Sequence, residues 1–369
     1  MGLSRIEISG FKSFSNAGVS IDFGTTTLLL GANGSGKSNL VSFFQMLEFA
    51  MTGGLKNYVE KYDVATLLHY GPKVTETVKC NLIFDSESGK TEYEIRFSYG
   101  LPDRLFISGE RVSFARGDRL KPQEYFLESH EGGPGILVDL RQTSKVLKSF
   151  LWGLKSYQFH DTSEMAAIRR KGNADDVKYV RRDAGNLAAF LKMLKESDEF
   201  NPYYKRIVRH IQKVMPQFGD FSVDALPNNG NEVRLNWTDI HQTDYLFSPH
   251  QISDGSLRFM ALATLLLQPP SLLPKFIVID EPELGLHPTA LVELTGIMKI
   301  AQKNCQLLLA TQSTRLVDEF GIENLVIADR HPGETGSQFS RKNPEQIKPW
   351  LEEYSLSELW EKNVLGGLP

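Results

Sequence analysis

Eight consecutive residues, Gly31 to Ser38, have the types and spacing of a phosphate-binding loop. Glycines let the backbone turn tightly, so that its N–H groups can point inward at phosphate oxygens. In this pattern Lys37 reaches the β- and γ-phosphates, and the hydroxyl of Ser38 can bind Mg²⁺. The sequence therefore predicts binding of ATP or GTP by a site that comprises Gly31, Asn33, Gly34, Ser35, Gly36, Lys37, Ser38 and Asn39.

The flanking residues are of the kinds that must position such a loop. Thr25 to Leu30 form a β-prone and increasingly apolar run, which predicts a buried strand. From Ser38 to about Ala50 we expect a helix whose apolar stripe contains Leu40, Phe43, Phe44 and Leu47. Its N-terminus would direct the positive end of the helix dipole at the phosphates. This order of strand, loop and helix argues against a chance glycine-rich loop.

A second acidic motif follows another buried strand. Phe276 to Ile279 are apolar on both faces, as expected of a strand in a parallel sheet that helices cover. Asp280 would lie at the C-terminal end of this strand, where open α/β sheets carry their ligand chemistry, and could hold Mg²⁺ through water. The adjacent Glu281 could orient and polarise the attacking water of phosphoryl transfer. The alternative is an ordinary acidic turn before Pro282.

Two short polar segments complete the pattern. Ser253, Gly255 and Ser256 precede a clear helical run that starts at Leu257, and a small polar cap on a helix start can bind an anion. Most such sequences are simply helix caps, so it is the position of this one, just before the Asp280 strand, that makes it informative. Further on, the mostly apolar run 306–310 predicts another strand, which ends in a polar turn that contains Gln312.

These motifs and their order resemble the ABC-type ATPase heads of the RecF/SMC/OLD branch, and most closely a family of compact bacterial ATPases labelled AAA. The resemblance covers the whole chain. The segments that carry it are Gly10-Phe11-Lys12-Ser13-Phe14, Tyr157-Gln158-Phe159-His160-Asp161-Thr162-Ser163, Asp254-Gly255-Ser256-Leu257-Arg258-Phe259, Asp280-Glu281-Pro282-Glu283-Leu284-Gly285-Leu286-His287-Pro288, Thr311-Gln312-Ser313 and Leu359-Trp360-Glu361-Lys362-Asn363-Val364-Leu365-Gly366-Gly367.

The resemblance implies a composite active site that forms when two copies dimerise around ATP. In this class the signature segment completes the γ-phosphate site of the opposite subunit, so its Ser253, Gly255 and Ser256 would contact the nucleotide of the partner copy. It also places Lys12 in the nucleotide site. It places Gln312 where a γ-phosphate-sensing switch belongs, although many relatives carry His there, which leaves a direct catalytic role for Gln312 open.

A further polar side chain is expected to complete the Mg²⁺ or water shell, as the Q-loop does in relatives. Gln158 fits this role by residue type, and His160 fits if the loop is aligned on its apolar residue. A structural turn with a satisfied histidine is the alternative. His287 occupies the place of the D-loop, and we expect it to serve the dimer interface rather than to bind a metal.

The expected fold is α/β, a P-loop NTPase of the ABC-type head kind, with a mostly parallel core sheet, an antiparallel subsheet and a helical lobe. Alternating residues in 78–84, 92–99 and 105–114 predict the subsheet, as part of a first segment, 1–160, that contains the phosphate loop. A second segment, 161–251, would be helical between Glu164 and Lys213 and then turn at 228–231 between two strands. The third segment, 252–369, carries the remaining motifs. No sustained heptad pattern predicts a coiled coil.

Composition sets further limits. At 369 residues and 41% hydrophobic residues, the chain can bury one large core or two lobes. No apolar run approaches the roughly 20 residues that span a membrane, and the N-terminus has no signal-peptide pattern. The two cysteines, Cys80 and Cys305, are expected to be reduced thiols. We therefore expect a cytoplasmic protein that does not contact a membrane.

A basic stretch between residues 169 and 213 leaves two interpretations open. It is either a solvated helical face or a groove that binds nucleic acid through its backbone, without base recognition. The net charge of −4 and the pI of about 6.1 do not indicate nucleic-acid binding. The cations are Arg169, Arg170, Lys171, Lys178, Arg181, Arg182, Lys192, Lys195, Lys205, Arg206, Arg209 and Lys213.

The sequence as a whole indicates an ATP-binding and hydrolysing switch that forms a homodimer. The resemblance implies a role in bacterial anti-phage defence or genome maintenance, with a separately encoded, nuclease-like effector. A stand-alone DNA-repair ATPase and an ATP-dependent scaffold with little turnover are the alternatives, and a transporter subunit is disfavoured. Near the chain end, Trp350, Leu351, Tyr354, Leu356, Leu359 and Trp360 are expected to pack on the ATPase core, with partner docking as the alternative.

Overall fold

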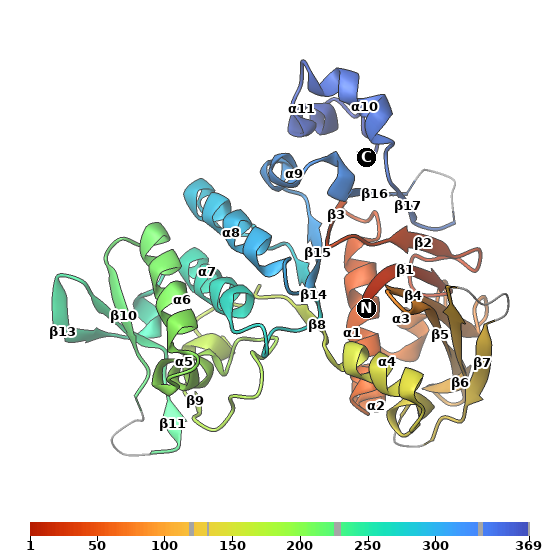
Figure 1. Cartoon of the computed structure of the whole chain (residues 1–369), viewed down its shortest axis with the longest axis horizontal. Helices are drawn as coiled ribbons and strands as arrows, with labels where there is room; N and C mark the ends of the chain where they lie inside the picture. The colour runs from red at the N-terminus through yellow and green to blue at the C-terminus, as the bar shows by residue number, and fades with distance from the viewer. Residues whose placement is uncertain (118–121, 131–132, 225–229, 331–334, 368–369) are drawn as a thin grey trace. The chain divides into compact units, whose positions relative to one another are not determined.

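The computed structural model describes residues 1–117, 122–130, 133–224, 230–330 and 335–367. The chain forms two compact units (Figure 1). Unit 1 comprises Met1–Ser156, Lys275–Val278 and Gln306–Pro369, and unit 2 comprises Tyr157–Pro274 and Ile279–Cys305. Each unit is built from segments that are not consecutive in the sequence.

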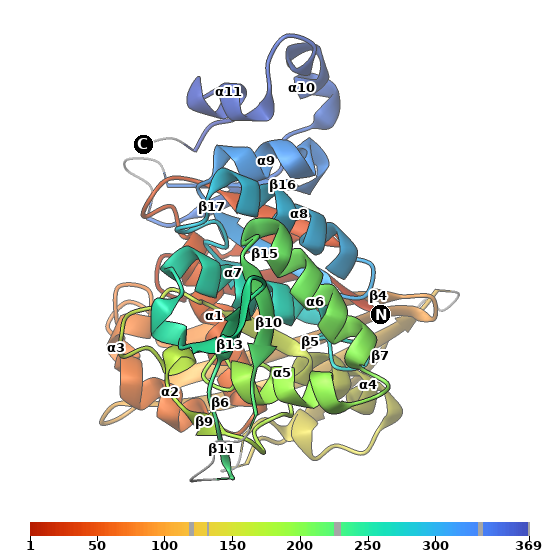
Figure 2. The same cartoon turned by 90° about the vertical axis from the view of Figure 1, so that its left-hand side faces the viewer.

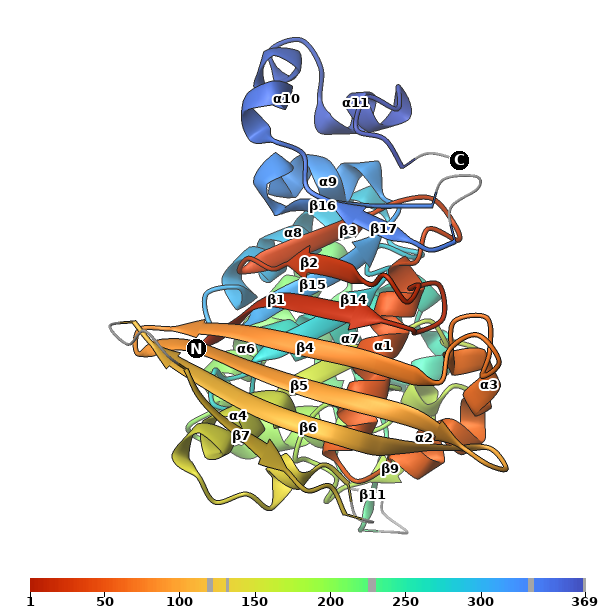
Figure 3. The same cartoon turned by 90° about the vertical axis from the view of Figure 1, so that its right-hand side faces the viewer.

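A six-stranded antiparallel sheet forms one layer of unit 1 (Figure 3). Side chains alternate between its faces, so that Val78, Cys80 and Leu82 are buried while Lys79 between them is exposed. The predicted antiparallel subsheet is thus confirmed. Its strands, in spatial order, are β2 (Val19–Asp22), β1 (Gly2–Ser9), β4 (Thr77–Ser86), β5 (Gly89–Gly100), β6 (Arg104–Arg116) and β7 (Gln123–Leu127).

The second sheet contains the strands that precede the sequence motifs. The strand β3 pairs in parallel with β15 and β16, and the register places Leu30 opposite both Thr311 and Ile327. All five residues of β3 are buried, as expected of a strand inside a covered parallel sheet. In spatial order the sheet comprises β17 (Gln338–Ser340), β16 (Leu325–Asp329), β3 (Thr26–Leu30), β15 (Gln306–Thr311), β14 (Phe276–Asp280) and β8 (Leu154–Tyr157).

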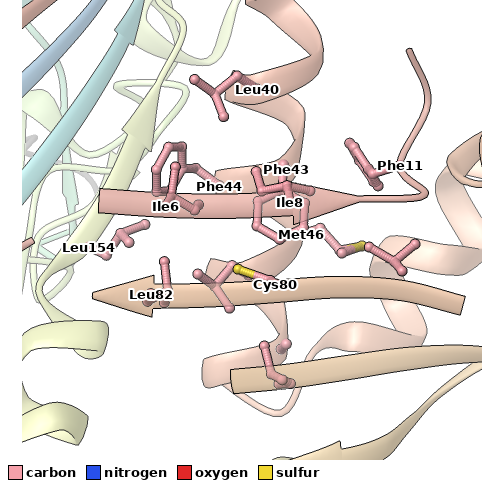
Figure 4. Packing of buried hydrophobic residues seen from close by; sticks show 14 of the residues in the cluster. Ile6, Ile8, Phe11, Leu40, Phe43, Phe44, Met46, Cys80, Leu82 and Leu154 are labelled. Carbon is pink, nitrogen blue, oxygen red and sulfur yellow. The ribbon is translucent and has the colours of Figure 1, made fainter. Parts of the chain in front are cut away.

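The helix α1 (Lys37–Met51) links these two sheets through one hydrophobic core. Figure 4 shows Phe43, Phe44 and Met46 of α1 against Ile6 of β1 and Leu82 of β4. The same core includes residues of β14, β15 and β16. The expected apolar stripe is therefore buried, and burial extends around most of the helix because sheets lie on more than one side. The helices α2 (Leu55–Tyr62), α3 (Val64–Leu67) and α4 (Gln142–Trp152) and the 3₁₀ turn η1 (Gly135–Leu137) complete this region.

The C-terminal segment belongs to unit 1 and packs on it. Leu356, Leu359, Trp360 and Leu365 are buried, and the backbone N–H of Ser357 donates to a carboxylate oxygen of Asp318, 2.9 Å away. Trp350, in contrast, is half exposed. The segment contains α10 (Pro344–Leu351) and α11 (Leu356–Glu361), and it follows α9 (Thr314–Phe320), which carries Asp318, and η4 (Ile322–Asn324).

Unit 2 is built on four helices with a small antiparallel sheet. Leu187, Phe190, Leu191 and Leu194 are buried on one stripe of α5, as the sequence predicts. In Figure 1 the helices α6, α7 and α8 lie next to one another. The helices are α5 (Leu187–Glu196), α6 (Asn201–Val214), α7 (Asp254–Leu267) and α8 (Pro288–Ala301), and the sheet comprises β10 (Phe218–Ser222), β12 (Asn236–Asp239) and β13 (Gln242–Phe247).

Two expectations for unit 2 need correction. Residues 164–186 are not α-helical but form turns, with the 3₁₀ turn η2 (Ala167–Arg169) and the short strand β9 (Gly172–Asn173). Glycines at 172 and 185 and the acidic turn residues between them favour loops over a helix. The run 232–237 divides into β11 (Glu232–Val233), which pairs with β9, and β12, which pairs with β10. Residues 228 and 229 of the expected turn, and residue 225 of the strand expected before it, lie outside the described residues.

The contrast between the two C-terminal tryptophans leads to a stability prediction. The side chain of Trp360 is 6% exposed and that of Trp350 is 48% exposed. Removing a buried tryptophan side chain costs about 3 kcal/mol or more, because packing is lost and a cavity remains. We expect Trp360→Ala to lower the melting temperature by about 6 °C or more, and Trp350→Ala to change it by no more than about 2 °C. Equal melting temperatures for both variants, by calorimetry, would contradict packing of this segment on unit 1.

Candidate functional site

The phosphate loop follows β3 directly and ends in the first turn of α1. Gly34 and Gly36 have φ angles of +80° and +112°, which side chains with a Cβ rarely adopt. At Gly36 a Cβ would come within 2.3 Å of the Ser337 hydroxyl oxygen. Only glycine fits this position, because Ser337 packs behind the loop and donates to the hydroxyl of Ser13, 2.8 Å away.

Lys37 folds back over this loop. Its side chain is buried, and its Nζ donates to the carbonyl oxygens of Gly31 and of Ala32, the latter 2.9 Å away. Ser38 is exposed in the first turn of α1. The buried hydroxyl oxygen of Ser35 has no hydrogen-bond partner among the described residues, so the loop contains a polar atom that a phosphate could satisfy.

The loop also contacts two distant parts of unit 1. The Nε2 of Gln312 donates to the Oδ1 of Asn33, 2.8 Å away. The parallel register of β3 and β15 explains this contact, because it brings the C-terminal ends of both strands to the same edge. From the C-terminal tail, the carbonyl oxygen of Gly367 accepts from the N–H of Ala32, 3.1 Å away.

A cavity of about 610 Å³ lies beside the start of α1. Burial lowers the pKa of Lys12, whose Nζ donates to the Ser42 hydroxyl 2.6 Å away. Lys12 and Tyr70 have φ angles of +47° and +55°. Such strain costs of order 1–3 kcal/mol for a residue with a Cβ and occurs most often at functional sites. Lining residues include Lys12, Ser13, Asn39, His69, Tyr70 and Arg330.

In unit 2, Asp280 is buried at the end of β14 and contacts both candidates for the third metal-shell position. The Nε2 of Gln158 donates to the Asp280 carboxylate, 2.8 Å away. The Nε2 of His160 donates instead to the backbone carbonyl of Asp280, 3.1 Å away. Gln158 is therefore the side chain that reaches the acidic group. Glu281, the next residue, has a left-handed backbone with φ of +47°, a third strained residue among the candidates.

The signature segment caps α7. Ser253 is the N-cap residue, and its hydroxyl oxygen accepts from the N–H of Ser256, 3.2 Å away. At Gly255 a Cβ would lie 2.3 Å from the carbonyl oxygen of Gly285, so the signature turn packs against the D-loop. His287 in that loop is exposed and caps α8 through Thr289.

Two arginines hold these segments together. The guanidinium of Arg258 donates to the carbonyl oxygens of Phe159, His160 and Leu284, at 2.9, 2.7 and 2.9 Å. One side chain of α7 thus joins the Q-loop to the D-loop. The sequence motifs do not predict this role for Arg258, although its position one turn into the signature helix is a usable signal.

Arg169 has a similar role on the other side of the signature turn. It is 5% exposed, and it donates to the carbonyl oxygens of Thr162 and Ile252, 2.8 and 3.1 Å away, and to that of Pro249. It also forms an ion pair of 2.7 Å with Asp254. A structural role within the site therefore replaces its interpretation as part of a basic surface.

The available donors fit Mg²⁺ better than a transition metal. The structure contains no cluster of three or more His, Cys, Asp or Glu suited to a metal within its described ranges. Ser38 of unit 1, and Asp280 and Gln158 of unit 2, offer oxygen atoms, which Mg²⁺ prefers, and Mg²⁺ usually shares its shell with water and substrate phosphates. Each unit thus carries side chains of the kind that suit Mg²⁺.

Together the fold and these motifs are those of a P-loop ATPase head. A model of the family described as "AAA domain, putative AbiEii toxin, Type IV TA system" matches residues 26–318, and the chain belongs to this family. Among curated proteins, no relative matches in sequence.

Solved SMC heads share the fold at low sequence identity. An SMC head bound to the C-terminal winged-helix domain of ScpA is 14% identical, with a TM-score of 0.59 over 95% of this chain and 100% of that one. A second SMC head, with an extended coiled coil and bound to the C-terminal domain of ScpA from Pyrococcus furiosus, is 15% identical, with a TM-score of 0.55 over 95% and 99%. Within the described residues, no helix is long and apolar enough to span a membrane.

The contacts of Arg258 yield a prediction that does not depend on activity. A hydrogen bond from a charged group contributes about 1.5–3 kcal/mol, so losing three should free the loops they hold. We expect Arg258→Ala to accelerate amide hydrogen exchange by more than about tenfold in residues 158–163 and 283–287. Arg170→Ala, which removes an exposed arginine of the same unit, is the control. Unchanged exchange in Arg258→Ala would show that these contacts do not hold the loops.

Proposed function

We propose that this protein is a molecular switch that binds and hydrolyses ATP and dimerises around it. The contact between Gln312 and Asn33 carries the proposal, because it links a side chain after β15 to the loop that would hold the phosphates. A γ-phosphate at this loop would compete with that contact. Binding or loss of the γ-phosphate would therefore change the contacts of Gln312 and the position of α9, which begins two residues later.

The residues of the loop and of the β14 end have distinct roles in this proposal. Lys37 would exchange the carbonyl oxygens of Gly31 and Ala32 for the β- and γ-phosphates. Bound Mg²⁺ would neutralise charge on the phosphate oxygens. Ser38 would hold the ion directly and Asp280 through water, with Gln158 orienting the Asp280 carboxylate. Glu281 would orient the water that attacks the γ-phosphorus.

The cavity beside α1 is suited to the nucleoside end of ATP. It adjoins the helix whose N-terminus would hold the phosphates, and it presents a cation and an exposed aromatic ring. The ring of Tyr70 offers a stacking face, and Arg330 donates to its hydroxyl oxygen, 3.4 Å away. Lys12 lines the same cavity, as expected for a residue of the nucleotide site.

The dimer would place Ser253 and Gly255 of one copy against the γ-phosphate held by Lys37 of the other. Both signature residues lie at the N-terminus of α7, where backbone N–H groups favour an anion. Such an interface is isologous, so one two-fold axis creates two equal sites. ATP would stabilise the joined form by mass action, and hydrolysis would release it.

The cellular role that we propose is control of a separately encoded effector, in bacterial anti-phage defence or genome maintenance. The family description, which names a toxin–antitoxin system, supports a defence role. The SMC heads of similar fold were solved with a bound partner domain, which supports a head that docks a partner. A stand-alone DNA-repair ATPase and an ATP-dependent scaffold with little turnover remain the competing functions.

Two active-site variants separate nucleotide binding from hydrolysis. Lys37→Ala should abolish tight ATP binding, because the phosphates lose the lysine of the loop. Glu281→Gln should retain binding, slow hydrolysis and trap the ATP-loaded dimer. The measurements are the affinity for a fluorescent ATP analogue, phosphate release and mass by light scattering. Lys56→Ala and Glu353→Gln, at exposed positions, are the controls. Unchanged phosphate release by Glu281→Gln would exclude Glu281 as the water-orienting residue.

The shared site is tested by mixing two inactive variants. Ser253→Arg should leave nucleotide binding to each copy intact and block hydrolysis, because the added side chain would obstruct the partner's γ-phosphate. In a heterodimer with Lys37→Ala, one site carries both lesions and the other carries neither, so phosphate release should partly return. Full activity of Ser253→Arg alone would reject the shared site. An inactive mixture with confirmed heterodimers would contradict independent shared sites.

A further inference from the structure

The helix α6 presents a concentrated positive charge on its outer face. Lys205, Arg206, Arg209 and Lys213 are all exposed. At 100° per residue these four positions fall within one arc of about 100°. The opposite side of the helix carries the buried Tyr204, Ile207 and Ile211 and packs within unit 2. Figure 2 shows α6 turned toward the viewer, in front of α7.

The structure separates these cations from the rest of the basic stretch. Lys171, Arg181, Lys192 and Lys195 each form an ion pair with a nearby carboxylate, and Arg169 is buried. Those cations are largely neutralised within unit 2. At Lys171, Arg181, Lys192 and Lys195 the interpretation as a solvated, paired surface is therefore the better one, whereas Arg170 and Lys178 are exposed and have no ion pair among the described residues.

On α6 most of the cations have no ion-pair partner. Lys213 shares Glu293 of α8 with His210. Lys205, Arg206 and Arg209 have no carboxylate within ion-pair distance in the described part of the chain. Asp198 and Glu199 precede the helix, at its N-terminal end. The positive charge of Lys205, Arg206 and Arg209 is consequently not cancelled by ion pairs, whereas that of Lys213 is paired.

The shape and chemistry of this face favour a phosphodiester backbone over other anionic partners. From Lys205 to Lys213 the helix rises about 12 Å, and one strand of a duplex presents a phosphate every ~3.4 Å along its axis. The arc carries no exposed large apolar side chain of the kind that anchors protein interfaces. The apolar side of the helix is buried, so α6 cannot insert into a membrane surface.

We propose that the outer face of α6 binds the phosphate backbone of nucleic acid without reading its sequence. The guanidinium of Arg206 lies over the ring of Tyr203, 5.3 Å from its centroid, which restrains it at the edge of the face. Lys205 and Arg209, one turn apart, form the centre of the contact. The proposal does not depend on ATP hydrolysis or on the dimer.

The test removes charge from this face and, as a control, from the paired cations of the same unit. The variant is Lys205→Gln combined with Arg209→Gln, and the control is Lys171→Gln combined with Arg181→Gln, which loses the same net charge. Binding of a labelled mixed-sequence 30-nucleotide strand, and of its duplex, is measured by fluorescence anisotropy between 50 and 300 mM salt. Binding of the fluorescent ATP analogue shows that each variant is folded.

Three phosphate contacts, from Lys205, Arg206 and Arg209, predict a slope of log affinity against log salt of about −2.7 for the duplex and about −2.1 for the single strand. Losing two contacts should reduce the slope to about a third and weaken duplex binding about 50-fold at 0.1 M salt, while the control stays near the unmodified protein. Absence of binding at 50 mM salt, or equal losses in variant and control, would overturn the proposal. So would equally tight binding of labelled poly-glutamate with the same loss in the variant, since that result would indicate an acidic protein partner.

Discussion

The parallel pairing of β3 with β15 is the interaction on which the candidate phosphate site depends. Its register sets Leu30 opposite Thr311, so the loop after one strand and the polar turn after the other begin at the same edge of the sheet. Buried side chains around α1 hold that edge in place. Only glycine fits against Ser337 at position 36. The conformation of the loop therefore depends on its contact with Ser337 as well as on the φ angles that its glycines allow.

In unit 2, arginine side chains rather than secondary structure provide the hydrogen-bond donors for the carbonyl groups of the loops. The Q-loop, the D-loop and the signature turn are irregular backbone, and irregular backbone leaves carbonyl oxygens unpaired unless side chains satisfy them. Arg258 and Arg169 satisfy six of these oxygens, and they connect segments that are far apart in the sequence. Each arginine thus ties the segment after β8 to a second segment of unit 2.

Backbone strain occurs at the candidate site but not only there. Six non-glycine residues of the described ranges have positive φ angles, and three of them, Lys12, Tyr70 and Glu281, are candidate site residues, whereas Asp63, Ala184 and Asn363 lie elsewhere. Lys12 and Glu281 also lie in motifs that the sequence alone identifies. Tyr70 does not, because a tyrosine in a loop has no sequence signature, and only its φ angle and its position in the cavity mark it as a candidate.

The sequence by itself determined the motif order, the strand before the phosphate loop, the helix after it and the antiparallel subsheet, because each depends on local spacing and on hydrophobic period. It left open whether Gln158 or His160 completes the metal shell, which stays a prediction, and it could not separate the paired cations from the exposed ones of α6. It also failed over residues 164–186, where turns replace the expected helix. The tertiary structure showed that Gln158 reaches the Asp280 carboxylate, which cations are paired and where the turns lie. It could do so because side-chain reach, ion pairing and loop packing depend on residues that are distant along the chain.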